Sequence, residues 1–208
     1  MKTVYFVRHG QSRGNASLIT QQTETTELTA RGRLQAEEVA RHLQRIPLEA
    51  VIASTFARAR STAEEIGRGL GLRVEHSPLF IERRRPGVQI RKRKVHPNWL
   101  WTQLQLVLYS SRADYRHSDE ETAQDLLTRA HQALTLLELR TESTICVVTH
   151  AEFMRALHTV ITYGEGVTGK VYLGATRHMR LKNTALMIAD HEDDTWKVRI
   201  WNADAKEL

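Results

Sequence analysis

The sequence is poor in cysteine and has no long apolar runs, and each absence excludes a class of protein. The one cysteine, Cys146, has no partner in the chain for a disulfide, so we predict a cytoplasmic location. No stretch approaches about 18 consecutive apolar residues. The start, Met1–Arg8, is too short and too soon interrupted to be a signal peptide. We therefore expect no membrane association.

The composition is that of an ordinary globular protein. Of the 208 residues, 41% are hydrophobic and 26% are charged, which excludes collagen-like and disordered chains. The length favours one elaborated domain over two. Because the sequence contains neither internal repeats nor low-complexity tracts, we predict that residues 1–208 fold as a single domain.

The net charge of +6 comes from one segment. Between Glu82 and Lys94 the chain has seven basic residues and one acidic residue. Taking these from the totals of 30 and 24 leaves 23 basic and 23 acidic residues elsewhere. A regional excess of this kind fits a solvated surface loop, capture of a phosphorylated substrate, or binding of nucleic acid.

Three short apolar runs resemble buried strands that end in polar residues. They are Thr3–Val7 before Arg8-His9-Gly10, Ala50–Ala53 before Ser54-Thr55, and Ile145–Val148 before Thr149-His150. Helical periodicity occurs between and after them, at residues 36–43, 126–137 and 153–161. This alternation predicts an α/β fold, a three-layer sandwich in which helices flank a mainly parallel sheet. Ligands of such sheets bind at the carboxyl ends of the strands.

Two further segments complete the expected organisation. Residues 185–189 and 196–200 are separated by a polar stretch and predict a β-hairpin at the sheet edge. Residues 86–118 interrupt the alternation with basic residues and an amphipathic stretch, Trp99–Tyr109. We expect residues 86–118 to be an inserted cap segment over the active site.

Two arginines and two histidines follow the predicted strands. Arg8 and His9 come after the first strand, Arg58 after the second and His150 after the third. At one sheet edge they would form a cationic pocket suited to phosphoryl oxygens. No metal is expected, because the ten histidines show no close ligand spacing and the arginines would repel a cation. We also expect no organic cofactor.

Six motifs in this order resemble those of a known family. They are Arg8-His9-Gly10, Leu28–Ala36, Ser54–Ala63, Glu121–Arg129, Thr149–Arg155 and Lys182–Ala185. Together they resemble the histidine phosphatase superfamily, in its phosphoglycerate mutase-like branch. Ala151 stands where the family usually has glycine. The resemblance covers most of the chain outside residues 86–118.

The resemblance implies a role for each matching residue. His9 would attack phosphorus and become a transient phosphohistidine, and Glu82 would be the proton donor and later the acceptor. The expected contacts of the phosphoryl group are Arg8, Ser12, Asn15, Arg58, His150 and Ala151. The arginines that follow Glu82 favour its charged form, so Glu152 remains an alternative donor, although it could equally face solvent.

Three functions stay open at this point. The first is a metal-independent phosphatase that acts on a small phosphorylated substrate, as a monomer or homodimer. The second is a phosphoglycerate mutase, although mutases of this branch usually carry an aromatic residue where this chain has Gly14, before Asn15. The third, nucleic-acid binding with a vestigial site, would use Arg91–Lys94 with Trp99 and Trp101. We expect these tryptophans to pack the insertion instead, and nucleic acid is not a predicted partner.

Overall fold

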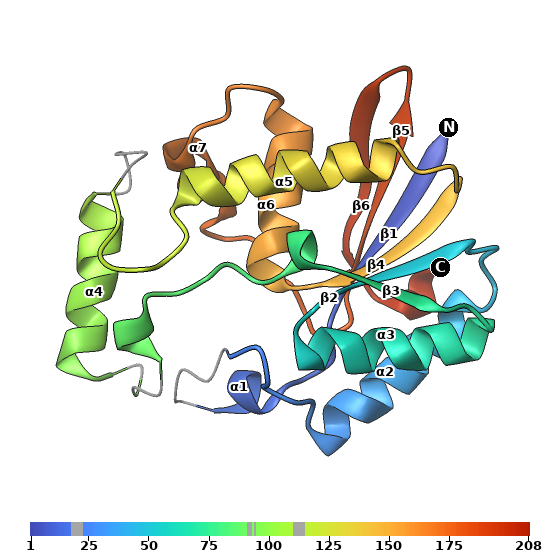
Figure 1. Cartoon of the computed structure of the whole chain (residues 1–208), viewed down its shortest axis with the longest axis horizontal. Helices are drawn as coiled ribbons and strands as arrows, with labels where there is room; N and C mark the ends of the chain where they lie inside the picture. Colours follow the sequence, from blue (N-terminus) through green and yellow to red (C-terminus); the bar gives the residue numbers. More distant parts are fainter. Residues whose placement is uncertain (18–22, 91–92, 94, 110–114) are drawn as a thin grey trace.

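A six-stranded sheet forms the centre of the molecule (Figure 1). The computed structural model describes residues 1–17, 23–90, 93, 95–109 and 115–208. The strands, in their order across the sheet, are β3 (Val74–Ser77), β2 (Ala50–Ser54), β4 (Thr144–Thr149), β1 (Lys2–Arg8), β5 (Leu186–Glu192) and β6 (Thr195–Ala203). The first four of these run parallel, and the predicted hairpin β5–β6 adds the antiparallel pairings. The expected mainly parallel sheet is confirmed.

Helices cover both faces of this sheet (Figure 1). The α-helices of the described residues are α1 (Arg13–Ala16), α2 (Ala30–Leu43), α3 (Ala57–Leu70), α4 (Pro97–Leu108), α5 (Ala123–Glu138), α6 (Ala151–Tyr163) and α7 (Gly169–Thr176). Helices α2 and α3 pack on one face, and α5, α6 and α7 on the other. This arrangement confirms the predicted three-layer sandwich. None of the helices in the described ranges is long and apolar enough to cross a membrane.

The alternation of side chains along β4 explains the two hydrophobic cores. Ile145 and Val147 point to the core under α5 and α6, whereas Cys146 and Val148 point to the core under α2 and α3. Both faces are covered, so the strand is a continuous apolar run. Burial raises the pKa of the Cys146 thiol to about 12, which makes it an inert core residue.

Strand register brings the predicted polar residues to one edge of the sheet. Arg8 at the end of β1 pairs with Thr149 at the end of β4, and Ala53 of β2 pairs with Val148. The sequence analysis did not assign β3, because its residues Val74–Ser77 include only one apolar side chain. As an edge strand, β3 has a single neighbour, β2, and needs no apolar run.

Helix α4 accounts for the amphipathic stretch within residues 86–118, but Trp101 does not pack as expected. The apolar residues Leu100, Trp101, Leu104, Val107 and Leu108 share one side of the helix and are exposed, whereas Thr102 on the opposite side is buried. Trp101 is 58% exposed, so the prediction that it packs the insertion is wrong. Residues 91–92, 94 and 110–114 of the segment lie outside the described residues.

Candidate active site

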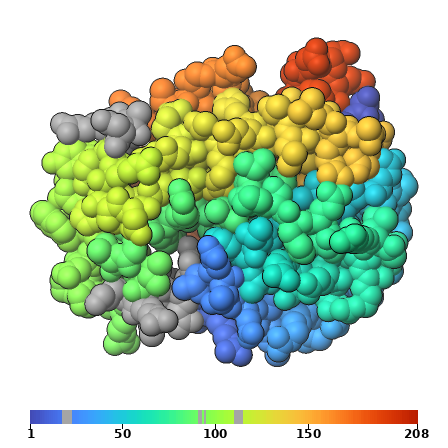
Figure 2. Space-filling model, viewed as in Figure 1, coloured from blue at the N-terminus to red at the C-terminus, as the bar shows by residue number. Residues whose placement is uncertain are grey.

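A polar cavity of about 190 Å³ lies at the carboxyl ends of the parallel strands. Figure 2 shows this face of the molecule hollowed between the blue N-terminal segment and the green chain that includes α4. The residues that line the cavity are Arg8, His9, Ser12, Asn15, Arg58, Glu82, Arg85, Ala151, Glu152 and Arg155. All but one of the predicted site residues therefore meet at one place, although they come from distant parts of the chain.

His9 is held as a neutral imidazole with a defined tautomer. Its Nε2 atom receives the Nε–H of Arg58 at 3.2 Å, and a guanidinium can only donate, so Nε2 carries no proton. Its Nδ1–H donates to the carbonyl of Gly10 at 2.6 Å. Burial, with the charges of Arg58 and Arg8, holds the pKa of His9 well below its ordinary value. Nε2 is therefore unprotonated, and its lone pair accepts the Arg58 hydrogen bond.

The loop that carries His9 is fixed from both sides. The Gly10 N–H donates to Thr62 Oγ1 at 3.1 Å, and Asn183 Nδ2 donates to the His9 carbonyl at 3.2 Å. A Cβ on Gly10 would lie 2.4 Å from the carbonyl oxygen of Gly32, so only glycine fits where the loop meets α2. The sequence analysis gave no role to Thr62 or Asn183, although both lie within recognised motifs.

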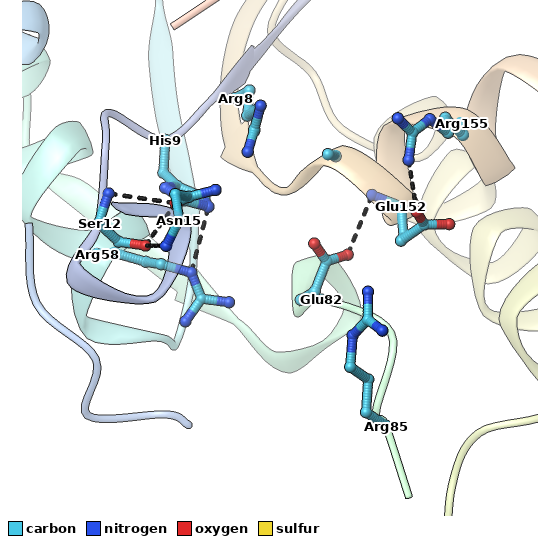
Figure 3. A pocket seen from close by; sticks show the side chains of 10 residues that line it. Arg8, His9, Ser12, Asn15, Arg58, Glu82, Arg85, Glu152 and Arg155 are labelled. Carbon is cyan, nitrogen blue, oxygen red and sulfur yellow. Dashed lines mark hydrogen bonds and ion pairs between the residues drawn. The ribbon is translucent and has the colours of Figure 1, made fainter. Parts of the chain in front are cut away.

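Arg8 and Arg58 flank His9 as fixed cations (Figure 3). Arg8 Nη1 donates to the Leu181 carbonyl at 2.5 Å, and Arg58 Nη1 donates to the Thr23 carbonyl at 3.0 Å. Arg8 Nε and Arg58 Nη2 are buried donors without a partner among the described residues. Burial lowers the pKa of Arg58 to about 10, so it stays charged at neutral pH. Buried cationic donors of this kind are suited to an anion such as phosphate.

His150 lies beside His9 but not among the residues that line the cavity. The two ring centroids are 5.0 Å apart, and His150 Nε2 hydrogen-bonds Ser54 Oγ at 2.8 Å. The Nδ1 atom of His150 is buried and has no partner in the described part of the chain. Burial, followed by the charge of Arg58, holds the pKa of His150 well below its ordinary value, so this ring is also neutral.

Ser12 and Asn15 form the wall beside His9. Ser12 is the N-cap of α1, and its side chain accepts a hydrogen bond from the Asn15 N–H. The Asn15 side chain in turn accepts the N–H of Ser12 at 3.2 Å, which completes a capping box. This reciprocal pair fixes the Asn15 amide group at the cavity wall, where a contact to the phosphoryl group was expected.

Glu82 lies across the cavity from His9 and Arg58 (Figure 3). It is 4% exposed, and its Oε1 accepts the N–H groups of Arg83, Glu152 and Phe153 at 3.1, 3.2 and 3.3 Å. Burial, followed by the negative charge of Glu152, raises the pKa of Glu82 against the opposing effect of Arg58. A carboxyl group with a raised pKa in a cavity is a candidate proton donor.

Glu152 is a clamped carboxylate in the same wall. Arg155 Nη1 donates to its Oε1, and the Tyr172 hydroxyl donates to its Oε2 at 2.7 Å. Burial opposes its ionisation, but Arg155, Tyr172 and the nearby Arg85 together hold the pKa of Glu152 below its ordinary value. A carboxyl group that stays ionised is a poor proton donor, so the geometry favours Glu82 over Glu152 for that role.

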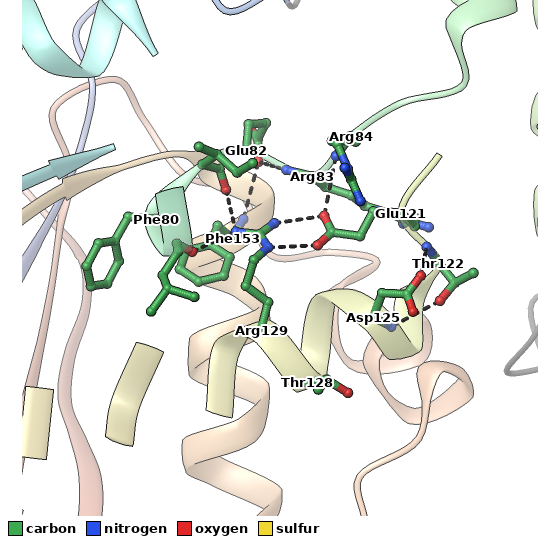
Figure 4. A network of polar contacts seen from close by, with 12 residues as sticks. Phe80, Glu82, Arg83, Arg84, Glu121, Thr122, Asp125, Thr128, Arg129 and Phe153 are labelled. Atoms are coloured by element: carbon green, nitrogen blue, oxygen red, sulfur yellow. Dashed lines mark hydrogen bonds and ion pairs between the residues drawn. The ribbon is translucent and has the colours of Figure 1, made fainter. Parts of the chain in front are cut away.

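A buried ion pair positions the chain that leads into Glu82 (Figure 4). Arg129 Nε and Nη2 each donate to a different oxygen of Glu121 at 2.7 Å. Its Nη1 donates to the carbonyls of Leu79 and Ile81, both at 2.8 Å. This is the structural basis of the Glu121–Arg129 motif. The pair holds the segment before Glu82 in place, but neither Arg129 nor Glu121 lines the cavity.

The structure adds two cations that the sequence analysis did not place in the site. Arg85 and Arg155 both line the cavity. Arg155 follows Glu152 by one helical turn on α6, a spacing typical of an ion pair. This spacing is the sequence signal that could have identified Arg155. No group of three or more His, Cys, Asp or Glu side chains within the described ranges could hold a metal ion.

Comparison with known proteins finds relatives along almost the whole chain. The family model described as "Histidine phosphatase superfamily (branch 1)" matches residues 4–204. The "Probable phosphoglycerate mutase GpmB" of Escherichia fergusonii is 29% identical over 97% of this chain and 90% of its own length. Its namesake from Erwinia tasmaniensis is 28% identical over the same shares.

Solved structures share the fold at lower identity. A mycobacterial glucosyl-3-phosphoglycerate phosphatase in complex with VO3 has a TM-score of 0.81 and 19% identity, over 98% of this chain and 100% of that one. YhfR of Bacillus stearothermophilus has a TM-score of 0.79 and 20% identity, over 99% of each chain. At these identities the similarity establishes the fold alone.

Proposed function

The chain belongs to branch 1 of the histidine phosphatase superfamily, and on this premise we propose that it hydrolyses phosphomonoesters through a phosphohistidine formed on His9. The observation that carries the proposal is the state of the His9 ring. Its Nε2 is unprotonated and faces two buried cations, while its Nδ1 is held by a backbone carbonyl. That is the arrangement an attacking imidazole requires.

In the first half-reaction a phosphomonoester binds with its non-bridging oxygens on the free donors of Arg8 and Arg58. The Arg58 Nε–H turns from His9 Nε2 to a phosphoryl oxygen, and the freed Nε2 lone pair forms a bond to phosphorus as the ester P–O bond breaks. Glu82, on the opposite wall, gives its proton to the leaving oxygen. Its raised pKa supports this role, because the group must hold a proton near neutral pH.

In the second half-reaction a water molecule attacks the phosphohistidine. Glu82, now a carboxylate, takes a proton from that water as the new P–O bond forms and the P–N bond breaks. Inorganic phosphate leaves, and both His9 and Glu82 return to their starting states. The fixed charges of Arg8 and Arg58 neutralise the phosphoryl oxygens throughout, so we propose that no divalent metal is required.

A mutase is the second candidate function, because the curated relatives named above are called probable phosphoglycerate mutases. A mutase would return the phosphoryl group from His9 to a second hydroxyl of the bound sugar acid. Gly14, in place of the aromatic residue usual before the asparagine, supports hydrolysis instead. We also propose that residues 86–118 form a cap that selects the substrate, and that the protein is cytoplasmic and a monomer or homodimer.

The test is a panel of phosphomonoesters with free phosphate as the readout, with and without EDTA. We expect phosphate release from p-nitrophenyl phosphate and from several small phosphate esters, at rates that EDTA does not change. Abolition by EDTA with rescue by magnesium or zinc would contradict the mechanism. Conversion of 3-phosphoglycerate to 2-phosphoglycerate without phosphate release would establish the mutase.

A further inference from the structure

Glu82 is bound in a way that by itself favours its anionic form. Its Oε1 accepts the N–H groups of Glu152 and Phe153 in the first turn of α6. The N-cap residue of that helix, His150, provides no side-chain hydrogen bond, so Glu82 caps the helix from a distant part of the chain. A helix N-terminus attracts negative charge. On these contacts alone Glu82 would be ionised and unable to donate a proton.

The charged groups around Glu82 also favour its ionisation, with one exception. The groups that face it are Arg8 of β1, Arg58 of α3, Glu152 of α6, Tyr172 of α7 and Arg85 of its own segment, while Arg83 donates its backbone N–H to Glu82. The neighbouring His9 and His150 are neutral. Among these groups Glu152 is the one negative charge, and it acts together with the burial of Glu82 against the cations and the helix terminus.

The neighbours of Glu152 stabilise its negative charge. Arg155 holds one carboxylate oxygen and the buried Tyr172 hydroxyl holds the other, and Arg155 is itself fixed by a bond of 2.7 Å to the Met179 carbonyl. Figure 3 shows Glu82 and Glu152 side by side on the cavity wall opposite His9. Two neighbouring carboxyl groups of which one is clamped as an anion push the second toward its protonated form.

We propose that Glu152 is a positioning residue for Glu82: a carboxylate clamped by Arg155 and Tyr172 whose negative charge keeps the neighbouring carboxyl group protonated and so ready to donate. The proposal rests on the phosphatase function proposed above and adds Glu152 to the residues that this function uses. Glu152 does not touch the reacting atoms, and it acts through Glu82.

The test is the pH dependence of kcat/KM for an alkyl phosphate, glycerol 3-phosphate, because this ratio covers the steps up to departure of the alcohol. Loss of activity at high pH reports ionisation of the donor. In Glu152→Gln we expect this basic limb to move to lower pH by about one unit or more. Glu152→Asp, which keeps the charge, and the exposed control Glu165→Gln should keep the limb near its wild-type position.

The outcomes separate this proposal from the proposed function. A wild-type protein that releases no phosphate from any ester would defeat the function itself. An active wild type whose profile superimposes on that of Glu152→Gln would overturn the role of Glu152. Equal damage from Glu152→Asp and Glu152→Gln, with no shift of the limb, would do the same, because a purely structural role predicts it.

A second measurement does not depend on Glu152→Gln folding. At about pH 6, above the ordinary titration range of a glutamate, the infrared spectrum of the wild type should contain the C=O stretch of a buried protonated carboxyl group. This band should be absent in Glu82→Gln. A wild type without the band at that pH would overturn the proposal.

Discussion

The sheet edge and helix α4 differ in which side chains they bury. At the sheet edge, polar residues are buried, with Ser54 and His150 at 0% and Arg58 at 2% exposure, and most of their polar atoms have a partner. On α4, apolar residues such as Trp101 and Val107 are exposed while Thr102 is buried. The polar groups at the sheet edge are therefore held by specific contacts, whereas the apolar face of α4 is not covered by the described part of the chain. Four substitutions test this contrast.

The largest effect is expected from His9→Ala at the sheet edge. Turnover should fall by at least about 10³-fold, because the variant lacks the proposed nucleophile. Labelled substrate quenched in alkali should leave a base-stable, acid-labile label on the wild type and none on the variant. The exposed His178→Ala should behave as the wild type. Turnover by His9→Ala near the wild-type rate, or acid-stable label on a serine, would refute the covalent mechanism.

Arg58→Ala should have the next largest effect. Its kcat should fall by about 100- to 1,000-fold, the usual cost of losing one preorganised donor to a transition-state oxygen. Arg60 offers a matched control, because it lies on the same helix but is exposed. Steady-state kinetics with p-nitrophenyl phosphate should show Arg60→Ala within about twofold of the wild type, since exposed charges are screened. Equal losses in the two variants would mean that burial at the sheet edge does not define the pocket.

Glu82→Gln should have an effect that depends on the leaving group. Alkyl phosphates need a proton on the departing oxygen, so their kcat/KM should fall by about 100-fold or more, whereas aryl phosphates should lose less than about tenfold. The raised pKa of Glu82 sets the sign of the pH dependence. Wild-type activity on alkyl phosphates is lost as pH rises through that pKa, and the aryl profile should be flatter there. A uniform loss on both ester classes would remove Glu82 from this role.

The smallest effect is expected on α4. Leu104→Gln should change the free energy of unfolding by no more than about 0.5 kcal/mol and leave the kcat for p-nitrophenyl phosphate unchanged, because Leu104 is 47% exposed. Leu126→Ala, in the core under α5, should cost about 2–5 kcal/mol. Urea unfolding measures both. A cost near 2 kcal/mol for Leu104→Gln would show that this face of α4 is covered in solution.

Local sequence patterns were sufficient for the core of the fold. The apolar runs that became β1, β2 and β4 were visible because strands covered on both faces must be continuously apolar. The N-cap of α2 depends equally on local residues, because the Thr29 side chain accepts the N–H of Gly32, three positions along the chain. The same logic placed His9 and Arg58 together, since parallel strands end at one edge.

Properties that depend on neighbours distant in the chain could not be predicted from the sequence. The weak edge strand β3 is specified by its pairing with β2 and not by its own residues. The outward orientation of Trp101 depends on which side of α4 meets the rest of the protein. The presence of Arg85 in the cavity wall depends on the path of the chain after Glu82.

The alternation of strands and helices and the identity of the chemical groups at the sheet edge can be predicted from the amino-acid sequence, because both follow from residues that are close in the chain. The charge state of each group depends instead on the folded protein. The arginines after Glu82 in the sequence indicate an ionised carboxylate, whereas its burial and the clamped Glu152 raise its pKa. Protonation depends on desolvation and on charges brought close by folding, and neither is encoded in local sequence.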